Sequence, residues 1–128
     1  MKNLGLGLLF LRVSFGGMML FGHGLGKLSN FSNIAQQFPA IFGMSSTLSL
    51  GLAVFAEFFC ALFIMLGLFT RVSSVMNLVT MLVAAFVVHA SDGFGGMEKA
   101  LLFAAGFLAI ILLGPGPYSI DAKKNVRW

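Results

Sequence analysis

Charged residues are scarce in this sequence, because Asp, Glu, Lys and Arg together make up 9% of its 128 residues. Soluble domains usually carry about 25% charged residues, which cover their surface. Here 59% of the residues are apolar and the mean hydropathy is +0.99. A small water-soluble core cannot bury that much apolar surface. The composition therefore excludes a soluble globular domain and predicts a protein whose main partner is the lipid bilayer.

Cysteine and histidine are also rare, which excludes several kinds of site. Cys60 is the single cysteine, so the chain has no disulfide framework and no CxxC motif, and we interpret Cys60 as a small buried hydrophobe rather than a redox centre. His23 and His89 are too far apart in sequence to share a helix face, which argues against a structural zinc site. The net charge is +4, but the basic residues are scattered or C-terminal, so we expect no nucleic-acid partner.

Four apolar segments indicate four membrane-spanning helices in a single domain, residues 1–128. Lipid admits only helices or closed barrels, and these segments lack the alternating pattern of barrel strands. Thr70 and Arg71 form so short a connection that the second and third helices must pack antiparallel. We therefore predict an all-α membrane protein, an antiparallel bundle of four transmembrane helices. The first span is expected to be retained rather than cleaved as a signal peptide. The predicted spans are about 4–25, 48–69, 72–89 and 98–113.

The link between the first two spans is polar but carries apolar residues at near-helical spacing. It runs from Ser29 to Thr47. We predict a short amphipathic helix on the membrane surface, interrupted at Pro39, with a plain loop as the alternative. The apolar residues that carry this prediction are Phe31, Ile34, Phe38 and Ile41.

The distribution of Lys and Arg predicts the orientation, because cytoplasmic loops of membrane proteins carry an excess of these residues. One side of the predicted bundle has five of them: Lys2, Arg71, Lys123, Lys124 and Arg127. The other side has Lys27 and Lys99. Both termini are therefore expected in the cytoplasm. The expected localisation is a bacterial or archaeal cytoplasmic (inner) membrane.

Arg12 and Glu57 lie well inside predicted spans, where a charged side chain costs about 2.5–3.5 kcal/mol and needs a reason. Counting residues from the helix ends gives the two similar depths. We predict that they form an ion pair that fixes helix packing. Glu57 as a proton-relay or ligand-binding carboxylate is one alternative, and Arg12 reaching back to the headgroups is another.

A second polar group should gather at the outer leaflet, because chain connectivity brings its members there. Taken singly, each is explained as an interfacial residue that faces water. Together with Arg12 and Glu57 they predict a polar pocket that opens outward. Imidazole exchanges protons near neutral pH, which suits a quinone or another carbonyl ligand, and haem ligation by the two histidines is less favoured. The group comprises His23, Lys27, His89, Asp92 and Glu98.

Five short stretches, taken in order, make the sequence resemble the DoxX family of small integral membrane proteins. The resemblance covers nearly the whole chain. It implies a four-helix membrane bundle and an association with respiratory or sulfur redox chemistry, since the name-giving members belong to quinone-linked thiosulfate oxidation. The missing cysteine pair argues against thiol–disulfide exchange by this chain alone. The stretches are His23–Lys27, Ala56–Glu57, Leu66–Arg71, Phe86–Gly93 and Gly114–Asp121.

Three functions are compatible with these features. The first is a redox-associated subunit, such as a subunit of a quinone-linked oxidoreductase complex, whose polar intramembrane pocket binds a quinone or a similar small molecule. The second is a non-catalytic scaffold that recruits a redox partner protein or assembles as a homo-oligomer. The third is a small lipid- or solute-binding transporter that uses the same pocket.

Overall fold

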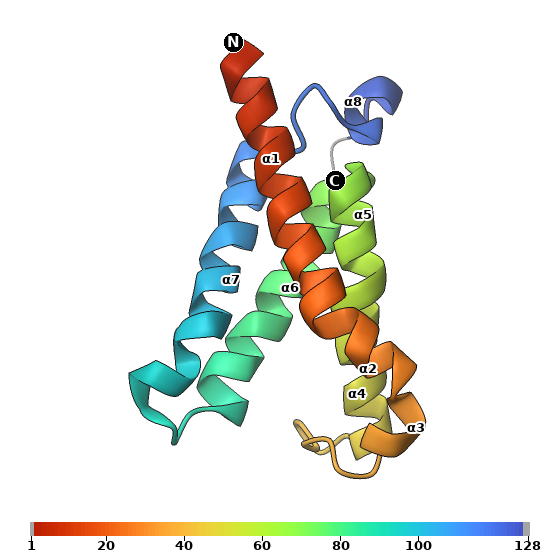
Figure 1. Ribbon diagram of the computed structural model, residues 1–128, viewed down its shortest axis with the longest axis vertical. Helices are drawn as coiled ribbons and strands as arrows, with labels where there is room; N and C mark the ends of the chain where they lie inside the picture. Colours follow the sequence, from red (N-terminus) through yellow and green to blue (C-terminus); the bar gives the residue numbers. More distant parts are fainter. Residues whose placement is uncertain (1, 127–128) are drawn as a thin grey trace.

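Four long helices form a bundle in the computed structural model, which describes residues 2–126 (Figure 1). They run from Lys2 to Ser29, Ser46 to Leu66, Thr70 to Val88 and Gly93 to Leu113. Each is long and apolar enough to cross a membrane. No strand occurs among the described residues. The predicted all-α bundle of four transmembrane helices is therefore confirmed, and its lipid-facing surface contacts the bilayer.

Three of these four helices contain a π-helical turn, in which each amide bonds the carbonyl five residues earlier. Such turns insert one extra residue, rotate the helix face and are frequent at functional sites. The fourth helix, α7 (Gly93–Leu113), is regular throughout. The segments of the other three are α1 (Lys2–Met19), η1 (Leu20–Gly24) and α2 (Leu25–Ser29), then α4 (Ser46–Val54), η2 (Phe55–Cys60) and α5 (Ala61–Leu66), then α6 (Thr70–Val83) and η3 (Ala84–Val88).

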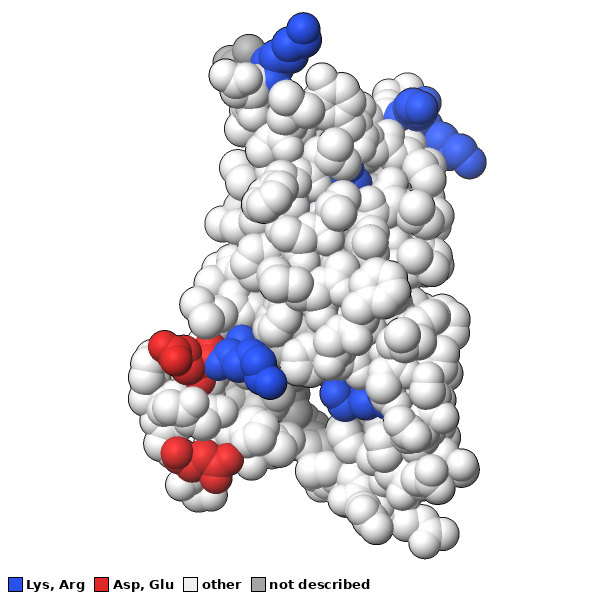
Figure 2. Space-filling model, viewed as in Figure 1, with Lys and Arg blue, Asp and Glu red and all other residues white. Residues whose placement is uncertain are grey.

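The helices pack in an order that Figure 1 makes visible, with α1 crossing the bundle between α7 and α5. α6 packs along α7, α1 packs against α5, and η1 meets η2. The core between them contains Met19, Ile64 and Phe107, which are fully buried. Charged side chains lie toward the top and in the lower part of the face in Figure 2, with a broad band between them that shows almost no charge. A low density of charge across the middle is what a membrane-spanning bundle requires.

The link between the first two long helices contains only one helical turn, α3 (Phe31–Ile34). Phe31, Ile34 and Phe38 are partly buried and pack against Leu50 and Val54 of α4. The apolar face of this short segment therefore contacts the bundle itself. We call the end of the bundle that holds this link and residues 89–92 the link end.

The opposite end is closed by the last described residues, and we call it the terminal end. The helix α8 (Ile120–Lys124) lies there above the end of α5, at the end of the bundle where α1 begins (Figure 1). The Asp121 carboxylate accepts hydrogen bonds from the backbone amides of Phe69 and Thr70, both at 2.8 Å. These amides begin α6 and have no partner within the helix. Asp121 therefore caps a helix that lies fifty residues earlier in the chain.

Candidate functional site

Arg12 lies at the terminal end and stabilises the end of a helix. Its guanidinium donates to the carbonyl oxygens of Ile64 and Met65, both at 3.4 Å, and to that of Tyr118. The last carbonyls of a helix lack the usual amide partner one turn further on, and Arg12 donates to two of those at the end of α5. The residue is 1% exposed. Its role is structural, and it is not among the residues that line the cavity described below.

The predicted ion pair between Arg12 and Glu57 is wrong, because Glu57 pairs with Lys27. Lys27 Nζ and Glu57 Oε1 are 2.7 Å apart. The first two long helices cross at Gly24, which lies against the backbone carbonyl of Glu57. Arg12 precedes Gly24 by twelve residues, or about 18 Å along the helix. Counting residues from the helix ends could not reveal where the helices cross, and the crossing decides the partner.

Gly24 is required by this close approach. A Cβ atom at this position would overlap the carbonyl carbon and oxygen of Glu57, which belong to the backbone and cannot rotate away. The contact joins η1 to η2, the two π-helical segments that carry His23 and Glu57. His89 directly follows the third, η3. Each π-helical turn thus contains or adjoins one of the predicted site residues.

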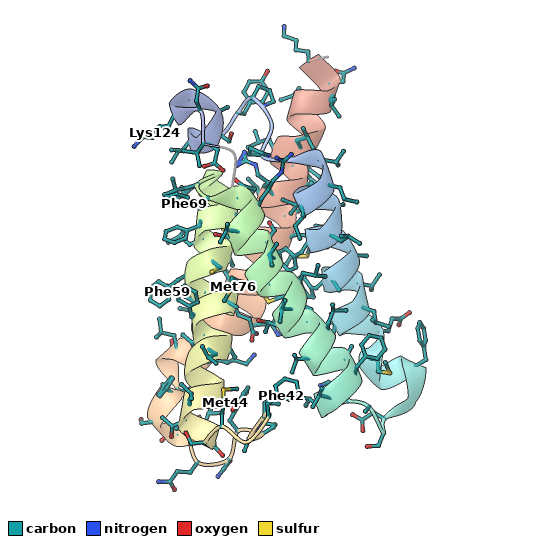
Figure 3. The ribbon with its side chains drawn as sticks, turned by 180° about the vertical axis from the view of Figure 1, so that it is seen from behind. Phe42, Met44, Phe59, Phe69, Met76 and Lys124 are labelled. Atoms are coloured by element: carbon teal, nitrogen blue, oxygen red, sulfur yellow. The ribbon has the colours of Figure 1, made fainter. Side chains whose placement is uncertain are left out.

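A cavity of about 580 Å³ opens at the link end, between α4, α6, the start of α7 and the link. Figure 3 shows Phe42 and Met44 at its link-end side and Met76 of α6 deeper in the bundle. Most of its wall is apolar. The polar side chains that line it are His23, Lys27, Ser49, Glu57, Thr80, His89 and Lys99.

Four of the predicted site residues therefore share one cavity: His23, Lys27, Glu57 and His89. The Glu57 side chain is 4% exposed and that of Lys27 23%, so the ion pair is largely shielded from solvent. The His23 ring meets the Phe103 ring edge to face, with the centroids 5.5 Å apart. This contact holds the imidazole at the cavity wall beside the Lys27–Glu57 pair.

Asp92 and Glu98 lie outside the lining of the cavity. Both residues are exposed. Asp92 Oδ2 is 2.8 Å from His89 Nδ1, so this carboxylate orients a histidine that does line the cavity. No group of three His, Cys, Asp or Glu side chains suited to a metal ion occurs within residues 2–126.

Sequence reasoning missed Lys99, whose side chain lines the same cavity as the two histidines. From its place in the sequence, Lys99 indicates only topology. A signal was present, because Lys99 and Phe103 are four residues apart on α7 and so share a helix face. Both line the cavity. The arrangement provides one shielded ion pair, two imidazoles and one further ammonium group on an apolar wall.

Comparisons with known proteins agree with this architecture. The profile of the DoxX family matches residues 7–90. The inner membrane protein YqjF of Escherichia coli (strain K12) is 31% identical over 109 residues, which cover 82% of each chain. No solved structure matches the sequence.

Proposed function

This chain is a multi-pass inner membrane protein that belongs to the DoxX family, and from that premise we propose that it is a redox-associated subunit whose link-end cavity binds a quinone or a similar small molecule. The observation that carries the proposal is the Lys27–Glu57 ion pair in the wall of a largely apolar cavity. Ligand sites in proteins combine apolar walls with a few polar groups that fix orientation. An ion pair in such a wall offers hydrogen bonds where lipid offers none.

The size and chemistry of the cavity support a ligand with a polar head and an apolar body. Its volume of about 580 Å³ lies within the usual range for small-molecule sites. His23 and His89 can donate hydrogen bonds to carbonyl oxygens, and imidazole exchanges protons near neutral pH. Met76 and Phe103 offer apolar contacts to the remainder of the ligand. In this proposal the chain itself binds the quinone and exchanges protons, and a redox partner protein supplies the electrons.

Saturation binding of a short-chain quinone analogue to the purified, detergent-solubilised protein tests the proposal. His23→Ala and Glu57→Gln should each weaken binding about tenfold, because a lost hydrogen bond to a ligand is worth about 1–2 kcal/mol. Glu98→Gln is the matched control, since it makes the same chemical change to an exposed carboxylate outside the cavity lining. Its affinity should equal that of the wild type.

Two results would contradict the proposal. One is that the wild type does not bind the analogue. The other is that His23→Ala and Glu57→Gln bind it as tightly as Glu98→Gln does. In either case the scaffold function takes its place, and the cavity would then be a feature of packing.

A further inference from the structure

A row of buried polar side chains runs along α6 and has no role in the proposed function. Counted from the first member of the row, the other three lie three, four and seven residues further along the helix. All four therefore share one face of the helix. All are at most 2% exposed. Polar groups buried this deeply in a membrane bundle are costly unless they are hydrogen-bonded. The residues are Thr70, Ser73, Ser74 and Asn77.

The row begins next to the link-end cavity, at Asn77, whose chain neighbour Met76 lines the cavity. Asn77 Nδ2 donates to the carbonyl oxygen of Ala56 at 2.8 Å, and Ala56 directly precedes Glu57 in η2. The same amide group lies 3.3 Å from the carbonyl oxygen of Ser73. The Ser73 side chain is in turn within hydrogen-bonding reach of Cys60. Asn77 thus joins the part of η2 that lines the cavity to the polar groups further along α6.

The row ends at the terminal end. The backbone amide of Thr70 donates to Asp121 Oδ2 at 2.8 Å. Asp121 borders an open surface depression together with Asn125 and Val126. The distance from Thr70 to Asn77 along the helix is about 10 Å, at 1.5 Å for each residue. A short polar stretch therefore separates two hollows that lie at opposite ends of the bundle.

Three polar atoms of the row lack a hydrogen-bond partner within the described chain: Thr70 Oγ1, Ser74 Oγ and Asn77 Oδ1. Serine, threonine and asparagine that only hold membrane helices together bond across the helix interface. The three atoms named above make no such bond. Buried polar groups left in this way are the usual partners of internal water.

We propose that this row is a hydrated polar path through which water reaches Glu57 from the terminal end of the bundle. The path depends on the orphaned polar atoms of α6 and on the contacts of Asn77 and Asp121, and it requires no ligand in the cavity. It goes beyond the proposed function, because it connects the cavity to the opposite side of the membrane. Hydrogen-bonded water relays protons, so the path also gives the cavity a proton route that does not cross its own mouth.

Cys60 is a natural probe of this path, because it is buried beside Ser73. A thiol reacts with metal ions and electrophiles as the thiolate. Forming this anion requires water nearby to take up the proton and to solvate the charge. Purified protein would be exposed to Ag⁺, a small hydrophilic ion, for increasing times. The thiol that remains free is then labelled with N-ethylmaleimide after denaturation and measured by mass spectrometry. The control is Cys60→Ala combined with Ala104→Cys, which places a thiol in the apolar core on α7.

We expect Cys60 to be blocked at least about tenfold faster than the thiol in the Ala104→Cys control. Combining Thr70→Val, Ser74→Ala and Asn77→Leu removes the polar atoms with little change in volume, and it should slow the blocking of Cys60 to the control rate. Ser14→Ala lies outside the row and should leave the rate unchanged.

The proposal is overturned if Cys60 in the wild type is blocked no faster than the control thiol, since the row would then be dry. It is also overturned if the combined variant is blocked as fast as the wild type. Should the combined variant fail to fold, the comparison of the wild type with the Ala104→Cys control still decides. Loss of quinone binding would leave these rates unaffected, so the path and the proposed function can fail separately.

Discussion

At the scale of single residues, the partner of a buried charge decides its role. Glu57 is paired with Lys27, which lies one helical turn beyond His23 at the cavity wall. Arg12, the partner expected from sequence, instead holds carbonyls at the end of α5. The attraction within a buried pair offsets part of the cost of removing both charges from water, and removing one partner leaves the other charge uncompensated.

We predict that Lys27 and Glu57 are energetically coupled. Glu57→Gln should destabilise the protein, and adding Lys27→Met should recover part of the loss because no unpaired ammonium remains. The coupling in a double-mutant cycle should be about 0.5–3 kcal/mol, measured by thermal unfolding in detergent micelles. The cycle of Arg12→Met with Glu57→Gln is the control and should be additive. Additive effects for Lys27 and Glu57 would show that their contact contributes nothing to stability.

At the scale of helices, the sequence predicted the four apolar segments but not the three π-helical turns. Apolar runs identify a membrane helix by length and composition, and neither property changes when a carbonyl bonds an amide five residues later. The consequence for the site is direct. η1 and η2 meet where Gly24 lies against the Glu57 backbone. This contact sets the depth in the bundle at which the Lys27 and Glu57 side chains form their ion pair.

We predict that Gly24→Ala destabilises the bundle by about 1–3 kcal/mol, because the added methyl group meets rigid backbone and the two helices must separate. Gly22→Ala is the matched control. It lies in the same π-helical segment, where an added Cβ has no neighbour within 4 Å. Alanine is favoured over glycine in helices, so this control should be neutral or slightly stabilising. Thermal unfolding in one detergent compares the two, and equal effects would argue against a tight crossing at Gly24.

At the scale of the whole molecule, the sequence predicted the bundle and part of its site. His23, Lys27, Glu57 and His89 could be grouped because connectivity brings them to one end of the bundle. Lys99 was not included, because a lysine near a membrane surface is expected simply to contact headgroups. The orientation of the bundle in the membrane stays a prediction that rests on the distribution of basic residues.

We predict that the link between the first two long helices faces the outside of the cytoplasmic membrane. Ser32 is exposed in this link, so Ser32→Cys in a Cys60→Ala background should react with an impermeant thiol reagent added to intact cells. Lys124→Cys in the same background is the control at the terminal end and should react only after lysis. The reverse pattern of labelling would mean that both termini lie outside.

The return of the C-terminal segment to the terminal end has a consequence for biogenesis. Tyr118 and Asp121 leave the ribosome after all four long helices, yet the carbonyl of the first accepts a hydrogen bond from Arg12 and the carboxylate of the second caps α6. The four apolar helices can enter the membrane one after another as they emerge. Arg12 and the first turn of α6 nevertheless have no partners until residues 118–121 have been made. Membrane insertion and completion of the fold are therefore separate events in time, and residues 118–121 close a structure that has already been inserted.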